Sequence, residues 1–349
     1  FMSNRFAKFL SVSASMALAA AVFAFPAAAA ETKTGAETET QSQETQYPIE
    51  IEHAFGTTVI ESKPERVVTV AFGNQDVALA LGVVPVGFSA ANYGVQDDSG
   101  MLPWTQEKLE ELGCEEPNVF QDTDGLDYEA ISDCDPDVIL AVYSGLTEEE
   151  YSMLSEIAPT VAYPESAWTV SWRDWIRYTA LGLGMEAEGE QLIADLENML
   201  AEKTAAYPDF EGKSFVWITF SEEDLSNLHA YAPIDPRCAF LIEDLGFTYP
   251  DSVSELIEDG SYSLSLSAEN ADLLYDADFL IGYSSDAAYE AAKEDTVLGS
   301  IPALQNDAVV SIESGTPLSA AMTITPLSME YTIDEYLEKI NEAVEEVNE

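Results

Sequence analysis

The sequence predicts an α/β protein with two similar lobes, joined by a single long helix that leaves a cleft between them. Three observations lead to this prediction. Strands alternate with helices over residues 47–167, the same alternation returns over 211–349, and the segment 168–210 between them has no strand signal. Such alternation is typical of parallel sheets with right-handed crossovers. The chain of 349 residues is long enough for two lobes of this kind.

The first 30 residues have the order of a secretory signal peptide. Arg5 and Lys8 precede an apolar run up to Phe25, and small residues follow to Ala30, after which we expect cleavage. An uncleaved anchor is the alternative, because the run approaches membrane-spanning length. No cysteine lies near this site, so we expect export to the periplasm or the outer face of the cell envelope without a lipoprotein anchor. Residues 31–46 are polar and acidic and predict a disordered tether.

The first lobe, 47–167, begins with a hairpin and continues as strands and helices. IEIEHAFGTTVI at 49–60 alternates and is broken by Gly56, which predicts the hairpin. PERVVTVAF then predicts a buried strand, NQDVALALG a helix that ends at Gly82, and VVPVGF a second strand. The further predicted elements are a helix near 104–112, a strand at 137–143, a helix at 147–158 and a strand at 160–163.

The segment 168–210 predicts the helical connection. Leu192, Ile193, Leu196, Met199 and Leu200 form an apolar stripe at helical spacing. A helix of about 20 residues spans about 30 Å, which is long enough to join two lobes rigidly.

The second lobe, 211–349, repeats the first in kind. It contains the strands KSFVWITF, DFLIGYS and AVVSI, with helices at CAFLIEDLG, near 287–293 and from Ile333 to Val347. LDYEAISDCDPDVIL at 126–140 and LSAENADLLYDADFLI at 266–281 share a leucine, a glutamate, a short helix and an aspartate before an apolar strand. Chance similarity of two such units is the alternative. The pattern predicts two Rossmann-like lobes with a ligand cleft between them.

The charge excludes several functions. Asp and Glu number 65 against 13 Lys and Arg, for a formal net charge of -52. Nucleic acid is excluded as a partner because phosphates need a basic footprint, and anionic membrane surfaces recruit polybasic segments. Two histidines and three cysteines are little material for a zinc site or a disulfide framework. Cys114 and Cys134 could still form a disulfide in an exported protein, with Cys238 left over.

Tyrosines and rare arginines are the candidate binding residues. Tyrosines follow several predicted strands, where α/β sheets usually bind ligands; they are Tyr93, Tyr143, Tyr231 and Tyr283. Residues 109–172 contain no Lys or Arg, and Arg173 and Arg177 follow this stretch. Arg237 opens a predicted helix, and residues 238–292 after it again contain no Lys or Arg. An arginine at a helix start can donate hydrogen bonds to ligand oxygens. The alternatives are ordinary packing for each tyrosine and pairing with nearby carboxylates for each arginine.

Several ordered segments resemble the ferric siderophore-binding components of ABC importers, a family shared with vitamin B12 binders. They include HAFGTTVIESKPERVVTVAFGNQDVALALGVVPVGFS, DYEAISDCDPDVILAVYSGLTEEEY, SWRDWIRYTALGLG and TPLSMEYTIDEYLEKI, and the resemblance runs from about 47 to 349. It implies capture of a ferric siderophore and delivery to a membrane permease dimer driven by a cytoplasmic ATPase. It also implies limited hinge motion, no catalysis and no intrinsic cofactor. We expect a monomer.

The resemblance also implies roles for particular residues. Arg237 matches a position that is typically basic and faces the cleft, and Trp172 and Arg173 match a Trp-Arg pair that begins the inter-lobe segment. The siderophore already coordinates its iron, so the protein needs aromatic walls and a few donors, and no metal ligands. Glu129 in LDYEAI and Glu269 in LSAENA align with glutamates, one per lobe, that pair with permease arginines in similar proteins.

Other functions remain as alternatives. Within the same class, the ligand could be haem, cobalamin or a metal ion, although metal binding is disfavoured because imidazole-rich sites are missing. The modest number of bases favours a hydroxamate siderophore over an anionic catecholate. An extracellular hydrolase would need a base, for which only His53 and His229 exist, and the Gly-x-Ser-x-Gly elbow is missing. A surface-adhesion protein without a small ligand is a more distant alternative.

Overall fold

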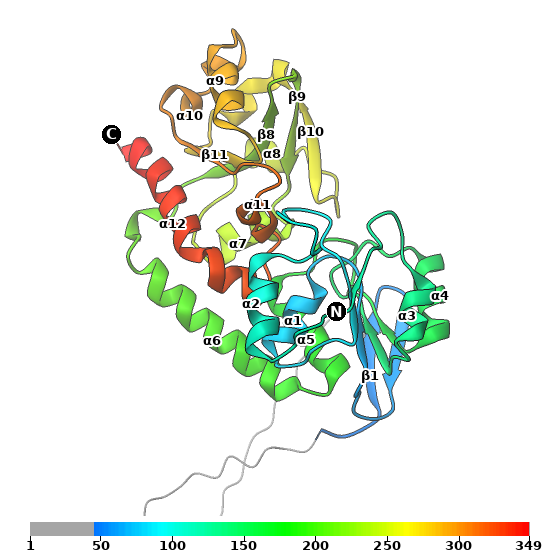
Figure 1. Cartoon of the computed structure of the whole chain (residues 1–349). Helices are drawn as coiled ribbons and strands as arrows, with labels where there is room; N and C mark the ends of the chain where they lie inside the picture. The colour runs from blue at the N-terminus through cyan, green and yellow to red at the C-terminus, as the bar shows by residue number, and fades with distance from the viewer. Residues whose placement is uncertain (1–44, 349) are drawn as a thin grey trace, which may run out of the picture. The chain divides into compact units, whose positions relative to one another are not determined.

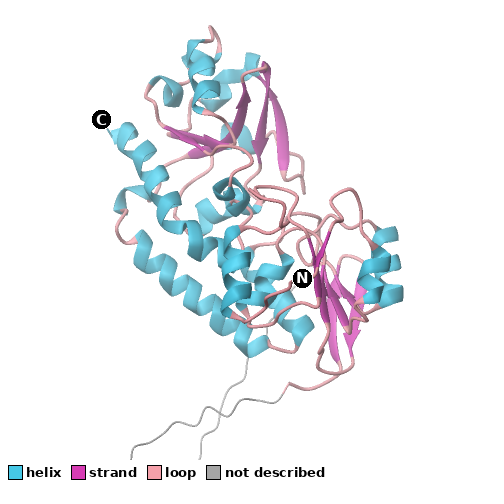
Figure 2. Cartoon of the chain, in the orientation of Figure 1, coloured by secondary structure: helices cyan, strands magenta, loops and turns pink. Residues whose placement is uncertain are grey.

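Two five-stranded sheets, each flanked by helices, organise the chain (Figure 2). The computed structural model describes residues 45–348, so the expected signal peptide at 1–30, and the expected tether up to residue 44, lie outside the described residues. Within the described part, no helix is long and apolar enough to cross a membrane.

The first sheet is entirely parallel and has the strand order β5-β4-β3-β6-β7. The hairpin predicted around Gly56 is present as the antiparallel pair of β1 and β2. The strand β5 was not predicted, because two residues are too few to give a pattern. The elements of this half are β1 (Ile49–His53), β2 (Gly56–Ile60), β3 (Val67–Thr69), α1 (Asn74–Ala80), β4 (Gly87–Ser89), α2 (Pro103–Glu111), β5 (Val119–Phe120), α3 (Tyr128–Asp133), β6 (Val138–Leu140), α4 (Glu148–Ile157) and β7 (Thr160–Val161).

The second sheet has the order β10-β9-β8-β11-β12 and is mixed. β8, β11 and β12 are parallel, whereas β9 runs antiparallel to both β8 and β10. The expectation that this half repeats the first therefore holds for the central strands only, since a tight turn joins β8 to β9 where the first half has a helical crossover. Its elements are η1 (Pro208–Phe210), β8 (Phe215–Ser221), β9 (Asp224–Tyr231), α7 (Pro236–Glu243), α8 (Asp251–Ser254), β10 (Ser263–Ser267), η2 (Ala268–Leu274), β11 (Phe279–Gly282), α9 (Asp286–Glu294), η3 (Leu298–Ser300), α10 (Pro302–Gln305), β12 (Val309–Ser311), α11 (Pro317–Ala321) and α12 (Pro326–Asn348).

The repeated sequence segments have the same structural role in the two halves. Asp137, just before β6, accepts hydrogen bonds from the backbone N–H groups of Glu65 and Arg66 at 2.7 and 2.9 Å. Asp278, just before β11, accepts one from the backbone N–H of Ser214 at 2.8 Å. Each aspartate thus holds the start of the neighbouring central strand, β3 or β8. The similarity between 126–140 and 266–281 reflects these equivalent positions.

Two helices follow the first sheet, so the expected single connecting helix is not confirmed. They are α5 (Trp172–Leu183) and α6 (Glu186–Thr204), and the chain turns between them at Gly184. Gly184 has a φ of 66°, in the left-handed region that glycine adopts readily at helix ends. The helices pack closely, because a Cβ at Gly189 would lie 2.6 Å from the Cβ of Ala180. The predicted apolar stripe lies on α6, where Ile193, Leu196 and Leu200 are buried.

The last helix, α12, contacts both halves of the chain (Figure 1). It packs against α1 and α2 of the first half and against β11 and β12 of the second. Directly before it, the Thr325 hydroxyl donates a hydrogen bond of 2.9 Å to Asp76 of α1. Asp76 is buried and also accepts bonds from Trp104 and Thr105 at 2.8 and 2.6 Å. The start of α12 is therefore held to the first half by a buried carboxylate.

Candidate functional site

Arg237 and four tyrosines from the two halves of the chain lie close together. Tyr93 follows β4 and Tyr143 follows β6, whereas Tyr231 ends β9 and Tyr283 follows β11. The ring centroids of Tyr93 and Tyr283 are 6.4 Å apart, as are those of Tyr231 and Tyr283. The Arg237 guanidinium carbon lies 3.9 Å from the centroid of Tyr231 and 5.9 Å from that of Tyr283. We call these five residues the tyrosine cluster.

Tyr143 joins the cluster from the first sheet and is held by two tryptophans. Its ring stacks on Trp175 at a centroid distance of 4.8 Å and meets Trp168 edge-on at 5.2 Å. Burial raises the pKa of Tyr143 to about 12, and the nearby positive charge of Arg237 opposes this rise. The phenol therefore stays neutral at physiological pH and can donate a hydrogen bond.

A glycine places Tyr283 in the cluster. Gly282 ends β11, and a Cβ at this position would lie 2.0 Å from the carbonyl oxygen of Ile218 in β8. Only glycine allows β11 to approach β8 this closely. The next residue, Tyr283, contacts Trp217 of β8 at a centroid distance of 5.6 Å. Trp217 also meets Tyr231 at 6.3 Å, so it supports two rings of the cluster from behind.

Arg237 is paired with Asp235, the residue that caps α7. The Asp235 carboxylate accepts hydrogen bonds from the Arg237 backbone N–H at 3.0 Å and from Nη2 at 3.2 Å. Nε lies 3.0 Å from Oδ1 but is not aligned for a hydrogen bond, and it has no other partner among the described residues. The Asp235 side chain is fully buried and that of Arg237 is 12% exposed. Burial raises the pKa of Asp235 to about 6, and Arg237 opposes this rise.

The two histidines lie in different places. His229 is exposed on β9, with its ring 5.0 Å from Tyr231, and both burial and the charge of Arg237 lower its pKa. His53 is buried in the hairpin, where Nε2 bonds Thr58 at 2.8 Å and Nδ1 accepts the Phe55 N–H at 3.2 Å. His229 therefore borders the tyrosine cluster, whereas His53 holds the hairpin together.

Trp172 and Arg173 form an ion-pair network outside the cluster. Asp244, the residue after α7, accepts hydrogen bonds from Trp172 Nε1 at 3.0 Å and from Arg173 Nη2 at 2.7 Å. Arg173 Nε also donates to Glu197 of α6 at 2.7 Å, and its guanidinium lies over the Trp172 ring at 4.2 Å. Arg177 likewise pairs with carboxylates, Asp174 and Glu190. Pairing with carboxylates is thus the arrangement that the structure shows for both helix arginines.

Glu129 and Glu269 occupy matching positions in the two halves. Each is the second residue of a short helix, α3 or η2, and each is exposed. Asp127 caps the first helix by accepting the Ala130 N–H at 3.0 Å, and Ser267 caps the second by accepting the Glu269 N–H at 3.4 Å. Both carboxylates are accessible to a partner.

The cysteines are free thiols in the structure, so the possible disulfide between Cys114 and Cys134 is not formed. Cys134 is buried, and its sulfur contacts the side chain of Asn118 and the carbonyl of Ala130. Between residues 45 and 348, no three His, Cys, Asp or Glu side chains are grouped so as to hold a metal ion.

Two features of the site were missed from the sequence. Trp217 lies in an apolar strand, where a tryptophan is usually core. The loop after β12 also contacts Tyr93. The Tyr93 hydroxyl lies 2.7 Å from the Ser314 hydroxyl and accepts a hydrogen bond from the Gly315 N–H at 2.9 Å. Nothing in the local sequence of this loop signals that contact.

Two α/β halves with an aromatic and cationic cluster at their junction define a class, the two-lobed solute-binding proteins. Comparison with known proteins agrees with this class. Residues 67–316 match the periplasmic binding protein family, and the chain belongs to that family.

Similar proteins include siderophore binders. The crystal structure of PiaA from Streptococcus pneumoniae TIGR4 in complex with ferrichrome is 46% identical, with a TM-score of 0.82 over 85% of this chain and 99% of that one. The probable siderophore-binding lipoprotein YfiY of Bacillus subtilis (strain 168) is 26% identical over 249 residues, 70% of this chain and 71% of YfiY. The ferric enterobactin-binding periplasmic protein FepB of Escherichia coli O6:H1 is 25% identical over 289 residues, 77% of this chain and 85% of FepB.

Proposed function

We propose that this protein captures a ferric siderophore at the tyrosine cluster and delivers it to an ABC importer. The observation that carries the proposal is the convergence of four tyrosines and Arg237 from four separate segments of the chain. The similarity to siderophore-binding proteins supports the same ligand class. The family consists of binding proteins, and we propose no enzymatic activity and no resident cofactor.

The chemistry of the cluster suits a ferric complex. Iron in such a complex is already coordinated, so the ligand offers a bulky surface and oxygen atoms near its centre. The aromatic faces of Tyr231 and Tyr283 supply the wall, and Arg237 supplies donors to the oxygens. Since the rings now contact each other, the ligand enters by separating the faces of the two halves.

The charge of the site favours a ligand with little net charge. Arg237 is the cation of the cluster, and Asp235 beside it carries the balancing carboxylate. The remainder of the protein is strongly acidic, with a net charge of -52. A highly anionic catecholate complex would be repelled by this field, whereas a neutral hydroxamate complex would not. We therefore propose a ferric hydroxamate.

We further propose that Glu129 and Glu269 orient the protein on the permease. Two exposed carboxylates at equivalent positions of the two halves can pair with arginines on a basic surface and fix the docking direction. Charge reversal of both, Glu129→Arg with Glu269→Arg, should abolish uptake and leave ligand affinity unchanged. Glu148→Arg, an exposed first-turn acid of α4, is the matched control and should retain uptake. A loss of ligand affinity in the double variant would contradict the assignment.

A ligand panel tests the proposed function. Native mass spectrometry or tryptophan quenching is measured with ferric hydroxamates, ferric catecholates, haem and cobalamin. Trp168 and Trp175 contact Tyr143, so a ligand at the cluster should change their fluorescence. We expect tight one-to-one binding of a ferric hydroxamate. Tight binding of haem or cobalamin without any ferric siderophore would favour the alternative ligands of the same transporter class.

A further inference from the structure

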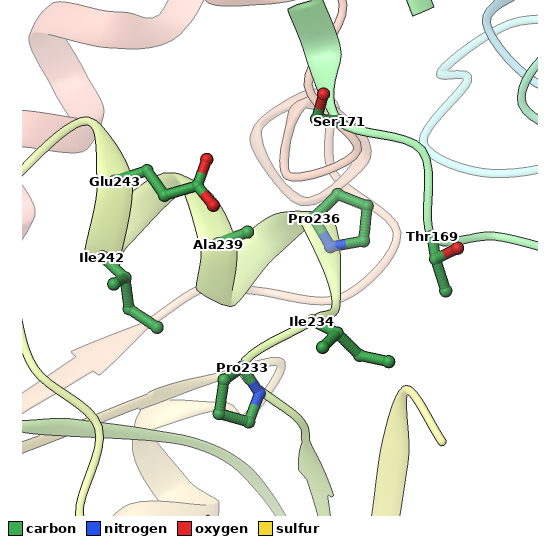
Figure 3. Close-up of a pocket in the computed structure, with 8 residues that line it drawn as sticks. All are labelled: Thr169, Ser171, Pro233, Ile234, Pro236, Ala239, Ile242 and Glu243. Carbon is green, nitrogen blue, oxygen red and sulfur yellow. The ribbon is translucent and has the colours of Figure 1, made fainter. Parts of the chain in front are cut away.

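Figure 3 shows the residues that line a hollow of about 390 Å³ between the start of α5 and α7. One wall is the segment before α5, and the other is formed by the β9–α7 loop and one face of α7. Its lining residues are Thr169, Ser171, Pro233, Ile234, Pro236, Ala239, Ile242 and Glu243. No residue of the tyrosine cluster is among them.

Each wall of the hollow contains a residue that is next in the chain either to a cluster residue or to Trp168, whose ring packs on Tyr143. Thr169 follows Trp168, whose ring lies 5.2 Å from that of Tyr143. Pro236 directly precedes Arg237, and Pro233 comes two residues after Tyr231 in the same chain segment. Consecutive Cα atoms are 3.8 Å apart, so the wall that contains Pro233 and Pro236 lies within one or two residues of the cluster, and the other wall adjoins the Trp168 ring that supports Tyr143.

The lining is apolar and carries no base. Five of the eight side chains are apolar, those of Pro233, Ile234, Pro236, Ala239 and Ile242. Ile234 is 46% exposed, one of the large apolar side chains left open to solvent. Glu243 is the only charged residue of the lining and disfavours an anion. The volume is within the range of pockets that hold small organic groups.

We propose that this hollow is a second subsite of the same cleft, which takes an uncharged apolar arm of the siderophore. The proposal rests on the proposed function, since the arm belongs to the ligand whose ferric centre lies at the tyrosine cluster. An alkyl or aromatic substituent would cover Ile234 and the apolar face of α7. The protein would then prefer siderophores that carry such an arm over those with the same iron-binding core and a polar arm.

Calorimetry with two matched ligands tests the subsite. Both are ferric tris-hydroxamates with the same core and the same net charge; one carries a hexyl chain and the other an uncharged chain of equal length that ends in a hydroxyl. Burial of a methylene changes affinity by about fourfold, so a chain that buries two or more should bind at least tenfold more tightly. Ala239→Trp fills the hollow and Ile234→Gln makes its wall polar, so each should abolish this preference while the core still binds.

Leu256→Gln is the matched control, because Leu256 is 48% exposed and does not line the hollow. It should keep the full preference, and circular dichroism checks that each variant is folded. If the two complexes bind equally well to the wild type, the subsite is overturned and the proposed function stands. If neither complex binds, the proposed function fails and the subsite with it. A preference that survives in both Ala239→Trp and Ile234→Gln also overturns the subsite, because the arm then lies elsewhere.

Discussion

Replacement of Arg237 by methionine tests the pair that we place at the centre of the binding site. The variant leaves the Asp235 carboxylate fully buried without its cation. Breaking a buried pair in this way typically costs about 3–5 kcal/mol. The carboxylate can instead take up a proton and become neutral. The free energy of that protonation is then the upper limit on the loss of unfolding free energy. In the wild type, burial already raises this pKa from 3.8 to about 6, which is one unit below pH 7, so the limit on the further loss is about 1.4 kcal/mol at about 1.4 kcal/mol per unit.

The size of the effect should therefore depend on pH. At pH 5, which lies below the wild-type pKa of about 6, Asp235 is already largely protonated, so the further loss falls close to zero. In the wild type, the pKa of Asp235 is raised to about 6, so its stabilising contribution is fully present below pH 3.8 and is lost as the pH rises through about 6. Removal of Arg237 should raise this pKa further and extend the pH range over which acid stabilises the fold.

Urea unfolding at pH 5 and 7 measures these differences. The double variant Asp235→Asn with Arg237→Met buries no charge, and asparagine retains the helix cap, so most of the lost stability should return. Affinity for a ferric hydroxamate should fall by about tenfold to a hundredfold in both variants, because both lack the charged donor. The reasoning is refuted if the double variant is as unstable as the single one, or if the single variant is equally destabilised at both pH values.

Three further predictions follow from other contacts. Arg173→Ala should lose about 1.5–3 kcal/mol of unfolding free energy, because it removes charged hydrogen bonds to a nearly buried carboxylate. Ligand affinity should stay unchanged if this ion pair is the whole role of Arg173, and a large loss of affinity would show that Arg173 binds the ligand. Burial lowers the pKa of His53, so its contribution is present above the ordinary pKa of 6.5 and is lost on acidification; His53→Gln should flatten the fall in melting temperature between about pH 7 and pH 5, and an unchanged slope would contradict this. Tyr93→Phe should speed hydrogen exchange at the Gly315 amide by removing its acceptor, and an unchanged exchange rate would show that the bond is not maintained in solution.

Apart from the two-residue strand β5, the order of strands in the first half could be predicted, because the central strands there are apolar and the hairpin alternates. The second half was predicted less completely. DLSNLHAY at 224–231 forms β9, yet only Leu228 and Ala230 in it are buried. A strand with so few apolar positions is stabilised by backbone hydrogen bonds to the strands on both sides. Backbone pairing of this kind does not require particular side chains, so the strand cannot be recognised from the sequence.

The candidate site was predicted in part because strand ends can be recognised from the sequence. The four tyrosines and Arg237 could be picked out individually, since four positions follow apolar runs and one opens a helix. Their mutual contacts could not be predicted, because they depend on the relative position of two sheets. For the same reason, the hydrogen bonds of Trp172 and Arg173 to Asp244 could not be predicted, because Asp244 is about 70 positions away in the chain.

A crystal structure of the protein with a bound ferric hydroxamate tests the central claim most directly. The account predicts that the complex lies between the two sheets, with the rings of Tyr231 and Tyr283 against its surface and the Arg237 guanidinium donating to its oxygens. An iron complex seated elsewhere on the protein, with the tyrosine cluster still closed, would contradict it.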